Sequence, residues 1–475
     1  MNKLDRLQSG IKGLDVITNG GLIAGAAYLI QGRPGCGKTI MANQIAFNHA
    51  NTGGRAIFVS LLSEPHDRLL QFLSTLSFYD ETKIGQEIIY ISAFDALESE
   101  GLDEVTKLLR REIKRHKATL LILDGLLNVR SQAETPLNIK KFLAELQVQA
   151  AFMGCTSLFL TSAEIDQGSP ELTMVDGVVT LAQQSYGARS LRRITLSKLR
   201  GSAFISGQHA YEISEKGITV YPRFEELFLI PTQTQKASLN RIETGVSGLD
   251  RVLNGGVHEN SVTLVFGPSG CGKTTLGLNF VTKATAQEKG LILTFYEESE
   301  QLVLKANELK MGLHELLQSD VVRIDWQPTT GLILDDVASR TLTTVREQGI
   351  KRVFIDSLAA LARPAMAQCR LVEFVSALMN ELRALGATVY VSWETSGFPG
   401  TDLQAPTPEL CSVVDNIFMM RFTESSNVDS YLSLSVVKSR YGRFDQRANN
   451  LSIGKGGVRF IGQGDFEAVD PLSDS

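Results

Sequence analysis

The sequence predicts an α/β protein of two tandem domains, each a mostly parallel β-sheet with helices on both faces. Three observations lead to this prediction: the length of 475 residues, an internal repeat, and short apolar runs that alternate with longer amphipathic stretches. The length is about three times the roughly 150 residues expected for one domain. With 43% hydrophobic and 21% charged residues, the composition is typical of a globular protein and excludes a disordered or fibrous chain.

The chain repeats itself at an offset of 235 residues. Residues 4–39 align without gaps to residues 239–274, with 16 identities in 36 positions. A repeat of this length is far above the roughly 20–50-residue period of solenoids, so it indicates a duplicated domain. We predict a first domain, a polar linker, a second domain and an acidic tail, at residues 1–226, 227–237, 238–460 and 461–475.

Apolar runs in each repeat indicate the strands of the two sheets, because short runs bounded by turn or polar residues are typical of buried parallel strands. In the first repeat they occupy residues 26–32, 56–62, 119–125 and 156–162; in the second they read SVTLVFG, LILTFYEE, RVFIDSL and ATVYVSW. The stretches between them have helical spacing, as in Leu102, Val105, Leu108, Leu109 and Ile113. Strand, helix and strand in series predict parallel sheets covered on both faces.

Charge and cysteine content narrow the classes of function. A net charge of -5 argues against a protein that coats nucleic acid. The basic run at residues 110–117 fits a solvated helix end, with a nucleic-acid contact as the alternative. The five cysteines show no CxxC pair and no zinc spacing, so a disulfide or metal framework has no support. Because the N-terminus does not look like a signal peptide and no apolar run reaches about 18 residues, we expect a cytoplasmic protein outside the membrane.

A phosphate-binding motif lies near the start of each repeat. GRPGCGKT and GPSGCGKT match GxxxxGK[ST], and each follows a predicted strand and precedes a helical stretch. Glycines let such a loop turn its N–H groups around phosphates, and the next helix adds the positive end of its dipole. We therefore predict that both domains bind ATP with Mg²⁺.

The predicted nucleotide ligands follow from this motif. In the first domain they are Gly32, Arg33, Pro34, Gly35, Cys36, Gly37, Lys38 and Thr39. In the second they are Gly267, Pro268, Ser269, Gly270, Cys271, Gly272, Lys273, Thr274 and Thr275. The lysines are expected to neutralise the β- and γ-phosphates, and the hydroxyl groups of Thr39 and Thr274 to bind Mg²⁺.

An aspartate ends an apolar strand in each repeat. Asp124 closes TLLILD and Asp356 closes RVFID. A P-loop fold places a carboxylate beside the Mg²⁺ ion at this position, whereas the alternative role of such an acid is to cap a helix. We predict that both aspartates belong to the nucleotide sites.

These residues resemble the KaiC family, the RecA-superfamily ATPases and autokinases of the cyanobacterial clock and their relatives in other bacteria. The resemblance covers about residues 1–460 and rests on the SGIKGLD opening, the P-loops, a glutamate pair and the doubled domain. It implies two RecA-like P-loop NTPase domains and a homohexamer of two tiers with ATP sites between subunits. A KaiB-like partner is possible on the first tier, but we do not expect the activator that binds a longer tail in the family.

In the family, paired glutamates after the second strand activate the attacking nucleophile. Glu297 and Glu298 match this pair, so the resemblance implies catalytic roles for both, with Lys273, and a metal-ligand role for Glu298. In the first repeat the offset of 235 leads to Leu62 and Ser63. Glu64 follows one residue late, so either it substitutes after a shift of register, or the first domain binds ATP and hydrolyses it poorly. We favour the second interpretation.

The family also supplies a Lys-x-Arg from a late strand to the γ-phosphate of the neighbouring subunit. The matching residues are Lys198, Leu199 and Arg200 in the first domain, and Lys438 and Arg440 in the second. Two cations two residues apart lie on one face of a strand and suit a clamp on phosphate charge. We predict this role for both motifs.

The autophosphorylated pair of the family corresponds here to Cys411 and Ser412, ahead of the DNI segment that begins at Asp415. Ser412 is therefore the predicted phosphoacceptor, and the alternation between two phosphorylated sites is not expected. No acceptor is predicted in the first repeat. We assign no site role to Trp393 or Glu394, which follow the fourth strand of the second domain.

The predicted function is that of a KaiC-like ring ATPase whose second domain transfers phosphate to water and to Ser412, as a serine/threonine autokinase in signalling or timing. One alternative is a DNA-dependent motor of the RecA/RadA type. The acidic balance and the lack of a zinc or helix-hairpin-helix module argue against it. Another alternative is a scaffold in which ATP only assembles the ring.

Overall fold

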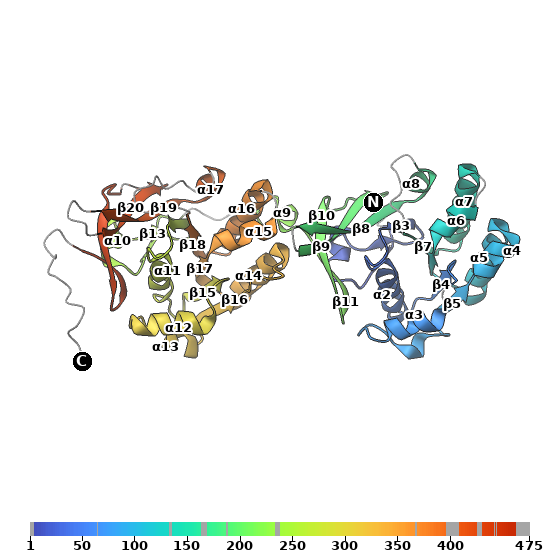
Figure 1. Ribbon diagram of the computed structural model, residues 1–475, viewed down its shortest axis with the longest axis horizontal. Coiled ribbons are helices and arrows are strands. Elements are labelled where there is room, and N and C mark those ends of the chain that lie inside the picture. Colours follow the sequence, from blue (N-terminus) through green and yellow to red (C-terminus); the bar gives the residue numbers. More distant parts are fainter. Residues whose placement is uncertain are drawn as a thin grey trace. The chain divides into compact units, whose positions relative to one another are not determined.

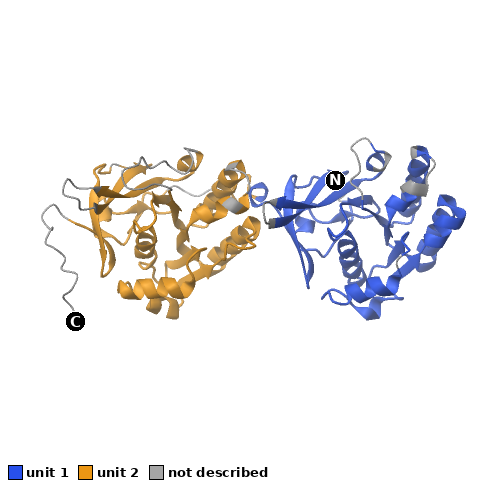
Figure 2. Cartoon of the chain, in the orientation of Figure 1, with its two compact units in different colours: residues 1–227 blue, residues 228–475 orange. Residues whose placement is uncertain are grey.

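The computed structural model describes residues 4–63, 65–132, 135–162, 169–186, 189–232, 238–365, 368–395, 408–424, 430–440, 442 and 444–461. The chain folds as two compact units, residues 1–227 and 228–475 (Figure 2). Part of the predicted linker is attached to the second unit. There Thr232 donates to the Glu381 carboxylate from its backbone N–H at 2.8 Å and from its hydroxyl at 2.6 Å.

The first unit alternates strands and helices before it ends in antiparallel strands (Figure 1). Its strands are β1 (Arg6–Leu7), β2 (Leu22–Ile23), β3 (Ala27–Gln31), β4 (Ala56–Ser60), β5 (Ile88–Ser92), β6 (Leu120–Asp124), β7 (Thr156–Thr161), β8 (Gly177–Tyr186), β9 (Arg189–Leu199), β10 (Gln208–Ser214) and β11 (Gly217–Tyr221). Its helices are α1 (Leu14–Ile17), α2 (Lys38–Asn51), α3 (His66–Leu73), η1 (Glu81–Lys83), α4 (Phe94–Glu100), α5 (Leu102–His116), α6 (Leu126–Gln132), α7 (Pro136–Phe152), α8 (Pro170–Met174) and α9 (Phe224–Leu227).

The second unit follows the same order. Its strands are β12 (Arg241–Ile242), β13 (Val257–His258), β14 (Val262–Gly267), β15 (Lys289–Thr294), β16 (Val322–Trp326), β17 (Ile350–Asp356), β18 (Thr388–Glu394), β19 (Asn416–Glu424), β20 (Ser430–Ser439), β21 (Asn449–Gly454) and β22 (Gly457–Phe460). Its helices are α10 (Ser247–Val252), α11 (Lys273–Val281), α12 (Ser299–Glu308), α13 (Leu313–Gln318), α14 (Leu334–Gln348), η2 (Leu358–Leu361), α15 (Ala362–Ala365), α16 (Gln368–Ala384) and α17 (Pro408–Val413).

Each unit is built on one large sheet, which within the described residues has nine strands. The strand order is β11-β10-β9-β8-β3-β7-β6-β4-β5 in the first unit and β16-β15-β17-β18-β14-β19-β20-β21-β22 in the second. The strands from β8 to β5, and from β19 to β16, run parallel, and the remaining three in each sheet are antiparallel. This confirms the predicted α/β class with a mostly parallel sheet.

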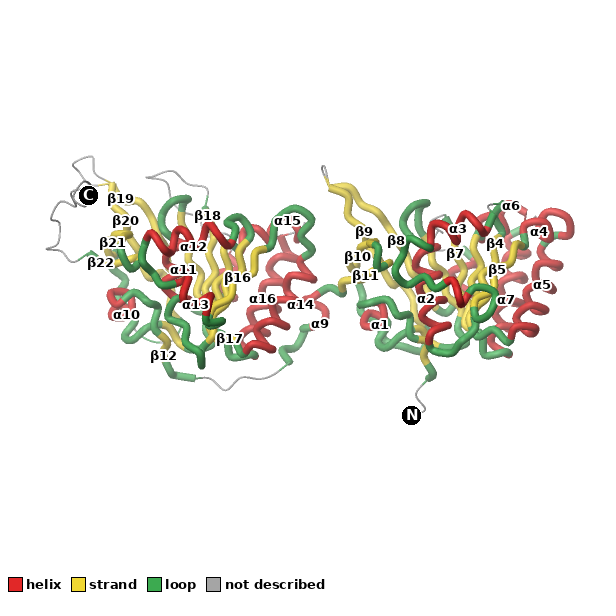
Figure 3. The backbone as a smooth tube through the Cα atoms, turned by 90° about the horizontal axis from the view of Figure 1, so that it is seen from below, coloured by secondary structure: helices red, strands yellow, loops and turns green. Residues whose placement is uncertain are grey.

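Helices cover both faces of the sheets (Figure 3). In the first unit Tyr28 and Ile30 of β3 pack in one core with α1 and α2, whereas Leu29 between them packs in a second core with α5 and α7. Successive side chains of a strand point to opposite faces, so every central strand contributes to both cores. Among the described residues, no helix is long and apolar enough to cross a membrane.

The predicted central strands match β3, β4, β6 and β7 and their counterparts in the second unit. The edge strands β5 and β16 were not predicted and lie within the stretches predicted to be helical. Both have half-exposed residues, with burial running from buried to exposed along β5 and β16. The β16 segment, VRIDW, lacks the continuous apolar run that identifies a buried strand. The β5 segment, IIYIS, does contain such a run and was overlooked.

The first and second units differ at a pair of facing core residues, one on a helix and one on a strand, whose sizes compensate each other. A Cβ atom added to Gly277 of α11 would lie 2.1 Å from the ring of Phe354 on β17, which is fully buried. The equivalent positions in the first unit, counted from the P-loop and from the strand-ending aspartate, are Ala42 and Ile122. A larger helix residue thus accompanies a smaller strand residue.

We predict that Gly277→Ala destabilises the protein by about 2 kcal/mol. Alanine favours a helix over glycine by about 1 kcal/mol, but overpacking a filled core costs up to about 3 kcal/mol, and the Phe354 ring is fully buried. Urea unfolding of the purified chain measures the change. Gly277→Ala combined with Phe354→Ile, which copies the first unit, should recover most of the loss; a single variant as stable as the parent would contradict the packing argument.

Candidate functional site

The P-loops follow the central strands β3 and β14 and lead into α2 and α11. Gly37 and Gly272 immediately precede these helices with φ of 95° and 89°. Glycine adopts this left-handed conformation without the steric cost that other residues meet. The loops therefore present the N-terminal N–H groups of α2 and α11, which is the arrangement that binds phosphate.

The first glycine of each motif is required by a neighbouring strand. A Cβ atom on Gly32 would lie 2.1 Å from the carbonyl oxygen of Leu181 on β8, and one on Gly267 would lie 2.2 Å from that of Met420 on β19. No side chain fits at such a distance. The sheet therefore approaches the start of the loop closely in both units.

The P-loop lysines are buried and held by the loop itself. Lys38 Nζ donates to the carbonyl groups of Gly32 at 2.7 Å and Arg33 at 3.1 Å. Lys273 Nζ donates to those of Gly267 at 3.0 Å and Pro268 at 2.6 Å. Each lysine is 8% exposed. Both ammonium groups therefore lie inside the loops, as a phosphate-binding role requires.

A hydrogen bond joins each P-loop to the aspartate predicted for the metal site. Thr39 Oγ1 donates to Asp124 Oδ2 at 3.0 Å, and Thr274 Oγ1 donates to Asp356 Oδ2 at 2.7 Å. A hydroxyl and a carboxylate this close fit the oxygen ligands that Mg²⁺ prefers. Among the described residues no group of three or more His, Cys, Asp or Glu is placed to hold a metal, so phosphate oxygens and water would complete the coordination.

The second unit has a cavity of about 1160 Å³ at this position. It is lined by Ser269, Gly270, Gly272, Lys273, Thr274, Thr275, Thr294, Tyr296, Glu297, Lys305, Glu308, Leu309, Asp356, Ser357, Ala359, Glu394, Thr395 and Ile453. The lining has four carboxylates and two ammonium groups. This surplus of negative charge fits a nucleotide that arrives with Mg²⁺ better than a free polyanion.

Sequence reasoning missed several of these lining residues. Lys305 and Glu308 belong to α12, and Ile453 to β21, so their approach to the P-loop depends on tertiary packing. Glu394, to which no role was assigned, also lines the cavity. The signal was its place at the end of β18, where it pairs in register with Gly267.

The glutamate pair divides between two roles in the structure. The Glu297 carboxylate lines the cavity and forms an ion pair with Lys305, with 3.3 Å between Oε1 and Nζ. Glu298 is the N-cap of α12, where its side chain accepts from the N3 backbone N–H and the Gln301 side chain accepts from the Glu298 N–H. Glu298 is not among the residues that line the cavity, so its predicted catalytic and metal roles remain predictions.

The sheet register corrects the alignment of this segment between the units. Ser60 pairs with Asp124 as Thr294 pairs with Asp356, which makes the local offset 234 instead of 235. Glu297 therefore corresponds to Ser63, not to Leu62. Position 298 corresponds to Glu64, which lies outside the described residues.

The Lys-x-Arg motifs lie at the amino ends of β14 and β3, away from the P-loop of their own unit. Lys438 Nζ donates to the carbonyl groups of Cys411 and Val414 at 2.8 and 2.7 Å. Asp415 accepts a hydrogen bond from Val262, the first residue of β14. The strand rises roughly 3.3 Å per residue, so the five steps from Val262 to Gly267 place this end about 17 Å from the P-loop. Neither Lys438 nor Arg440 lines the cavity.

The first unit repeats this arrangement. Lys198 Nζ donates to the carbonyl groups of Leu172 and Val175 at 2.8 and 2.5 Å, and Arg200 donates to that of Thr173 at 3.2 Å. Leu199, between the two cations, is buried. Burial and then the neighbouring arginine lower the pKa of Lys198, and the same two causes lower the pKa of Lys438.

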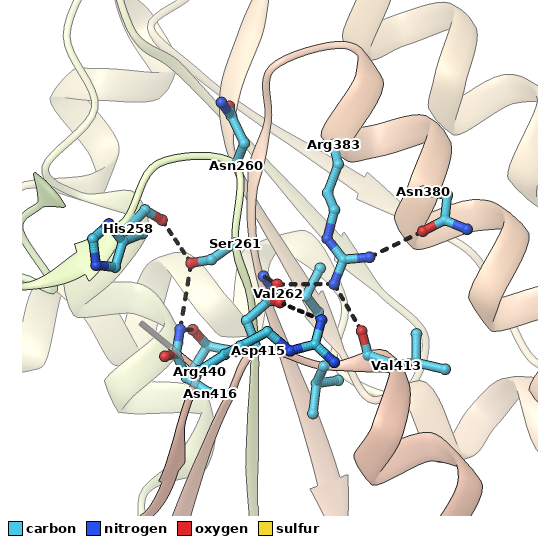
Figure 4. A network of polar contacts seen from close by, with 12 residues as sticks. His258, Asn260, Ser261, Val262, Asn380, Arg383, Val413, Asp415, Asn416 and Arg440 are labelled. Carbon is cyan, nitrogen blue, oxygen red and sulfur yellow. Dashed lines mark hydrogen bonds and ion pairs between the residues drawn. The ribbon is translucent and has the colours of Figure 1, made fainter. Parts of the chain in front are cut away.

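A buried carboxylate organises this end of the second unit (Figure 4). Asp415 is 3% exposed; its Oδ2 accepts from Val262 N at 2.9 Å and from Arg383 Nη2 at 2.8 Å, and its Oδ1 accepts from Arg440 Nη1 at 3.2 Å. Arg440 also donates to the carbonyl oxygen of Ser412 at 3.2 Å. The predicted acceptor, exposed on α17, is thus bonded through its backbone to the predicted clamp.

Comparison with known proteins follows the same division of the chain. The family model for the KaiC ATPase matches residues 7–225 and again residues 242–465. The circadian clock oscillator protein KaiC of Picosynechococcus sp. is 26% identical over 479 aligned residues, which cover 96% of this chain and 89% of that relative. KaiC 1 of Synechocystis sp. is 25% identical, with 96% and 88% covered, and KaiC of Synechococcus elongatus is 27% identical, with 75% and 70% covered. The chain therefore belongs to the KaiC family of ATPases.

Proposed function

We propose that the second unit hydrolyses Mg-ATP and phosphorylates Ser412, and that the first unit binds ATP but hydrolyses it poorly. The observation that carries the proposal is the cavity of the second unit, which joins the P-loop, the Thr274–Asp356 pair and the Glu297 carboxylate. A P-loop provides positioning and charge stabilisation, and a carboxylate beside it provides the base.

In the proposed reaction the Glu297 carboxylate accepts a proton from the attacking water or from the Ser412 hydroxyl. The oxygen of the water or of Ser412 forms a bond to the γ-phosphorus, the bond between the γ-phosphorus and the bridging oxygen breaks, and ADP leaves with the electrons of the broken bond. Lys273 stabilises the charge that develops on the phosphate. Mg²⁺, held by Thr274 and Asp356, would supply further charge neutralisation when bound.

The first unit supports a different role, in which ATP holds an assembly together. It has the phosphate loop and the Thr39–Asp124 hydrogen bond, but Ser63 stands where the second unit has Glu297. A serine hydroxyl is not a general base at neutral pH. We propose that ATP bound to this unit supports assembly of the ring, and that the assembled ring binds a KaiB-like protein through this unit.

We propose that both nucleotide sites are completed by Lys-x-Arg motifs from a neighbouring subunit in a two-tier homohexamer. The position of Lys438 and Arg440 at the amino end of β14 supports this, because the P-loop of the same unit lies at the opposite end of the strand. Ser412 lies at that same amino end, so the proposed phosphate transfer also takes place between subunits.

We predict that Glu297→Gln lowers phosphate release by the second unit at least about 100-fold, the size of a general-base contribution, without loss of ATP binding. Lys273→Ala should lose binding at this site as well. Steady-state phosphate release and binding of a fluorescent ATP analogue separate the two effects. A Glu297→Gln protein that hydrolyses ATP like the parent would contradict the assignment of the base.

We predict that Ser63→Glu, made in the Glu297→Gln background, raises the remaining hydrolysis because it places a carboxylate at the equivalent position of the first unit. Leu62→Glu in the same background is the matched control, since it adds the same charge one residue away. An increase with Leu62→Glu but not with Ser63→Glu would show that the alignment at an offset of 234 is wrong.

We predict that two inactive chains restore hydrolysis when they are mixed and reassembled. One chain carries Glu297→Gln and the other Lys438→Ala with Arg440→Ala, so some sites between them combine an intact base with an intact clamp. Phosphate release is measured after mixing in ATP, with each chain alone as the control. Mixed hexamers that stay inactive would contradict a shared site.

We predict that mass spectrometry after incubation with Mg-ATP finds phosphate on Ser412. Ser412→Ala should remove this phosphate and leave hydrolysis largely intact, because its hydroxyl is an acceptor and not part of the cavity. Cys411→Ala serves as the neighbouring control. Incorporation that persists unchanged in Ser412→Ala would place the acceptor elsewhere.

A further inference from the structure

The cavity of the second unit contains an ion pair that involves the proposed base. Lys305 Nζ lies 3.3 Å from Glu297 Oε1 and donates a hydrogen bond to it. Both side chains line the cavity, and they are 38% and 37% exposed. Lys305 lies on α12 and Glu297 in the turn that precedes this helix. The contact therefore depends on how α12 starts.

The backbone around Glu297 is fixed on both sides. Thr294 Oγ1, at the end of β15, donates to the Glu297 carbonyl oxygen at 2.8 Å. On the other side, the capping box of Glu298 and Gln301 sets the first turn of α12. The freedom that remains for the Glu297 carboxylate is rotation of its side chain, and Lys305 is positioned to restrict it.

Charge in the cavity explains why a cation is needed there. Glu297 shares the lining with Asp356, Glu308 and Glu394, and like charges repel a carboxylate from such a site. Lys273 already donates to the P-loop carbonyl groups. Of the two lysines in the described lining, Lys305 is therefore the one whose ammonium group donates a hydrogen bond to Glu297.

The first unit lacks both members of this pair. Counted from the strand ends Ser60 and Thr294, the position of Lys305 corresponds to Gln71; counted from the helix starts, it corresponds to Phe72. Neither side chain is a cation, and Ser63 stands in place of Glu297. Lys305 and Glu297 therefore occur together in the second unit, and the corresponding positions of the first unit have neither a cation nor a carboxylate.

We propose that Lys305 is a positioning residue for ATP hydrolysis in the second unit: it holds the Glu297 carboxylate toward the nucleotide. The proposal rests on the proposed role of Glu297 as the base. It assigns Lys305 no contact with phosphate, so the lysine acts on the chemical step through Glu297 and leaves the binding of ATP unchanged.

The test compares kcat and KM for Mg-ATP in the full-length protein. Lys305→Met should lower the Glu297-dependent kcat about two- to fivefold, the effect expected from a half-exposed ion pair, with KM unchanged. Lys305→Arg should restore kcat. In the Glu297→Gln background, Lys305→Met should have no further effect. Lys289→Met is the matched control, because Lys289 forms an ion pair with Asp320 that does not line the cavity.

Three results would overturn the proposal: an unchanged kcat in Lys305→Met, a raised KM, or a further fall in rate when Lys305→Met is added to Glu297→Gln. The last two would indicate direct contact with the nucleotide. Failure of the proposed function is seen separately, because Glu297→Gln alone would then hydrolyse ATP like the parent. If Glu297→Gln is inactive and Lys305→Met retains the parent kcat, only the positioning role is wrong.

Discussion

The hydrogen bond from the P-loop threonine to the strand-ending aspartate is the interaction around which each unit is arranged. Thr274 lies in the first turn of α11 and Asp356 ends β17, and β18 lies between β17 and β14 in the sheet. The bond forms only if these strands are parallel, in register and covered by α11. Parallel strands bring their carboxyl ends to one edge, so the loop, the aspartate, Glu297 and Glu394 meet there.

The two units share this arrangement of loop and strands but differ in the side chains around it. Both retain the loop geometry and the Thr–Asp bond, because these depend on glycine conformation and close strand contact. The cavity side chains differ: Glu297 and Glu394 of the second unit correspond to Ser63 and Ser162 in the sheet register. A duplicated fold can therefore keep its P-loop geometry while the side chains around the loop, including the proposed base, change.

The opposite end of the sheet has its own polar network. Asp415 joins the start of β14, Arg383 of α16 and Arg440, which directly follows β20, so this carboxylate connects three parts of the unit and holds one residue of the proposed clamp. A buried carboxylate with two arginine partners satisfies its charge and orients the guanidinium groups. Lys438 and the backbone of Ser412 are attached to the same structure, which couples the proposed clamp to the proposed acceptor helix.

The sequence by itself determined the duplication, the α/β class, the P-loops and the two aspartates, because each has a local signal. These signals are the internal repeat, the apolar runs, the glycine-rich motif and the position of each aspartate at the end of an apolar run. The edge strand β16 has no such run, and its half-exposed residues form a strand by pairing with β15. The other edge strand, β5, contains the apolar run IIYI, which the prediction overlooked, and pairs with β4. The roles of neighbouring residues were decided by the tertiary structure. Glu297 and Glu298 are adjacent and identical in type, yet one lines the cavity and the other caps α12. The tertiary structure also placed Lys305 and Glu394 in the cavity lining and aligned Ser63 with Glu297. The sequence could not show this, because the distance between two side chains depends on how the strands and helices that bear them are placed.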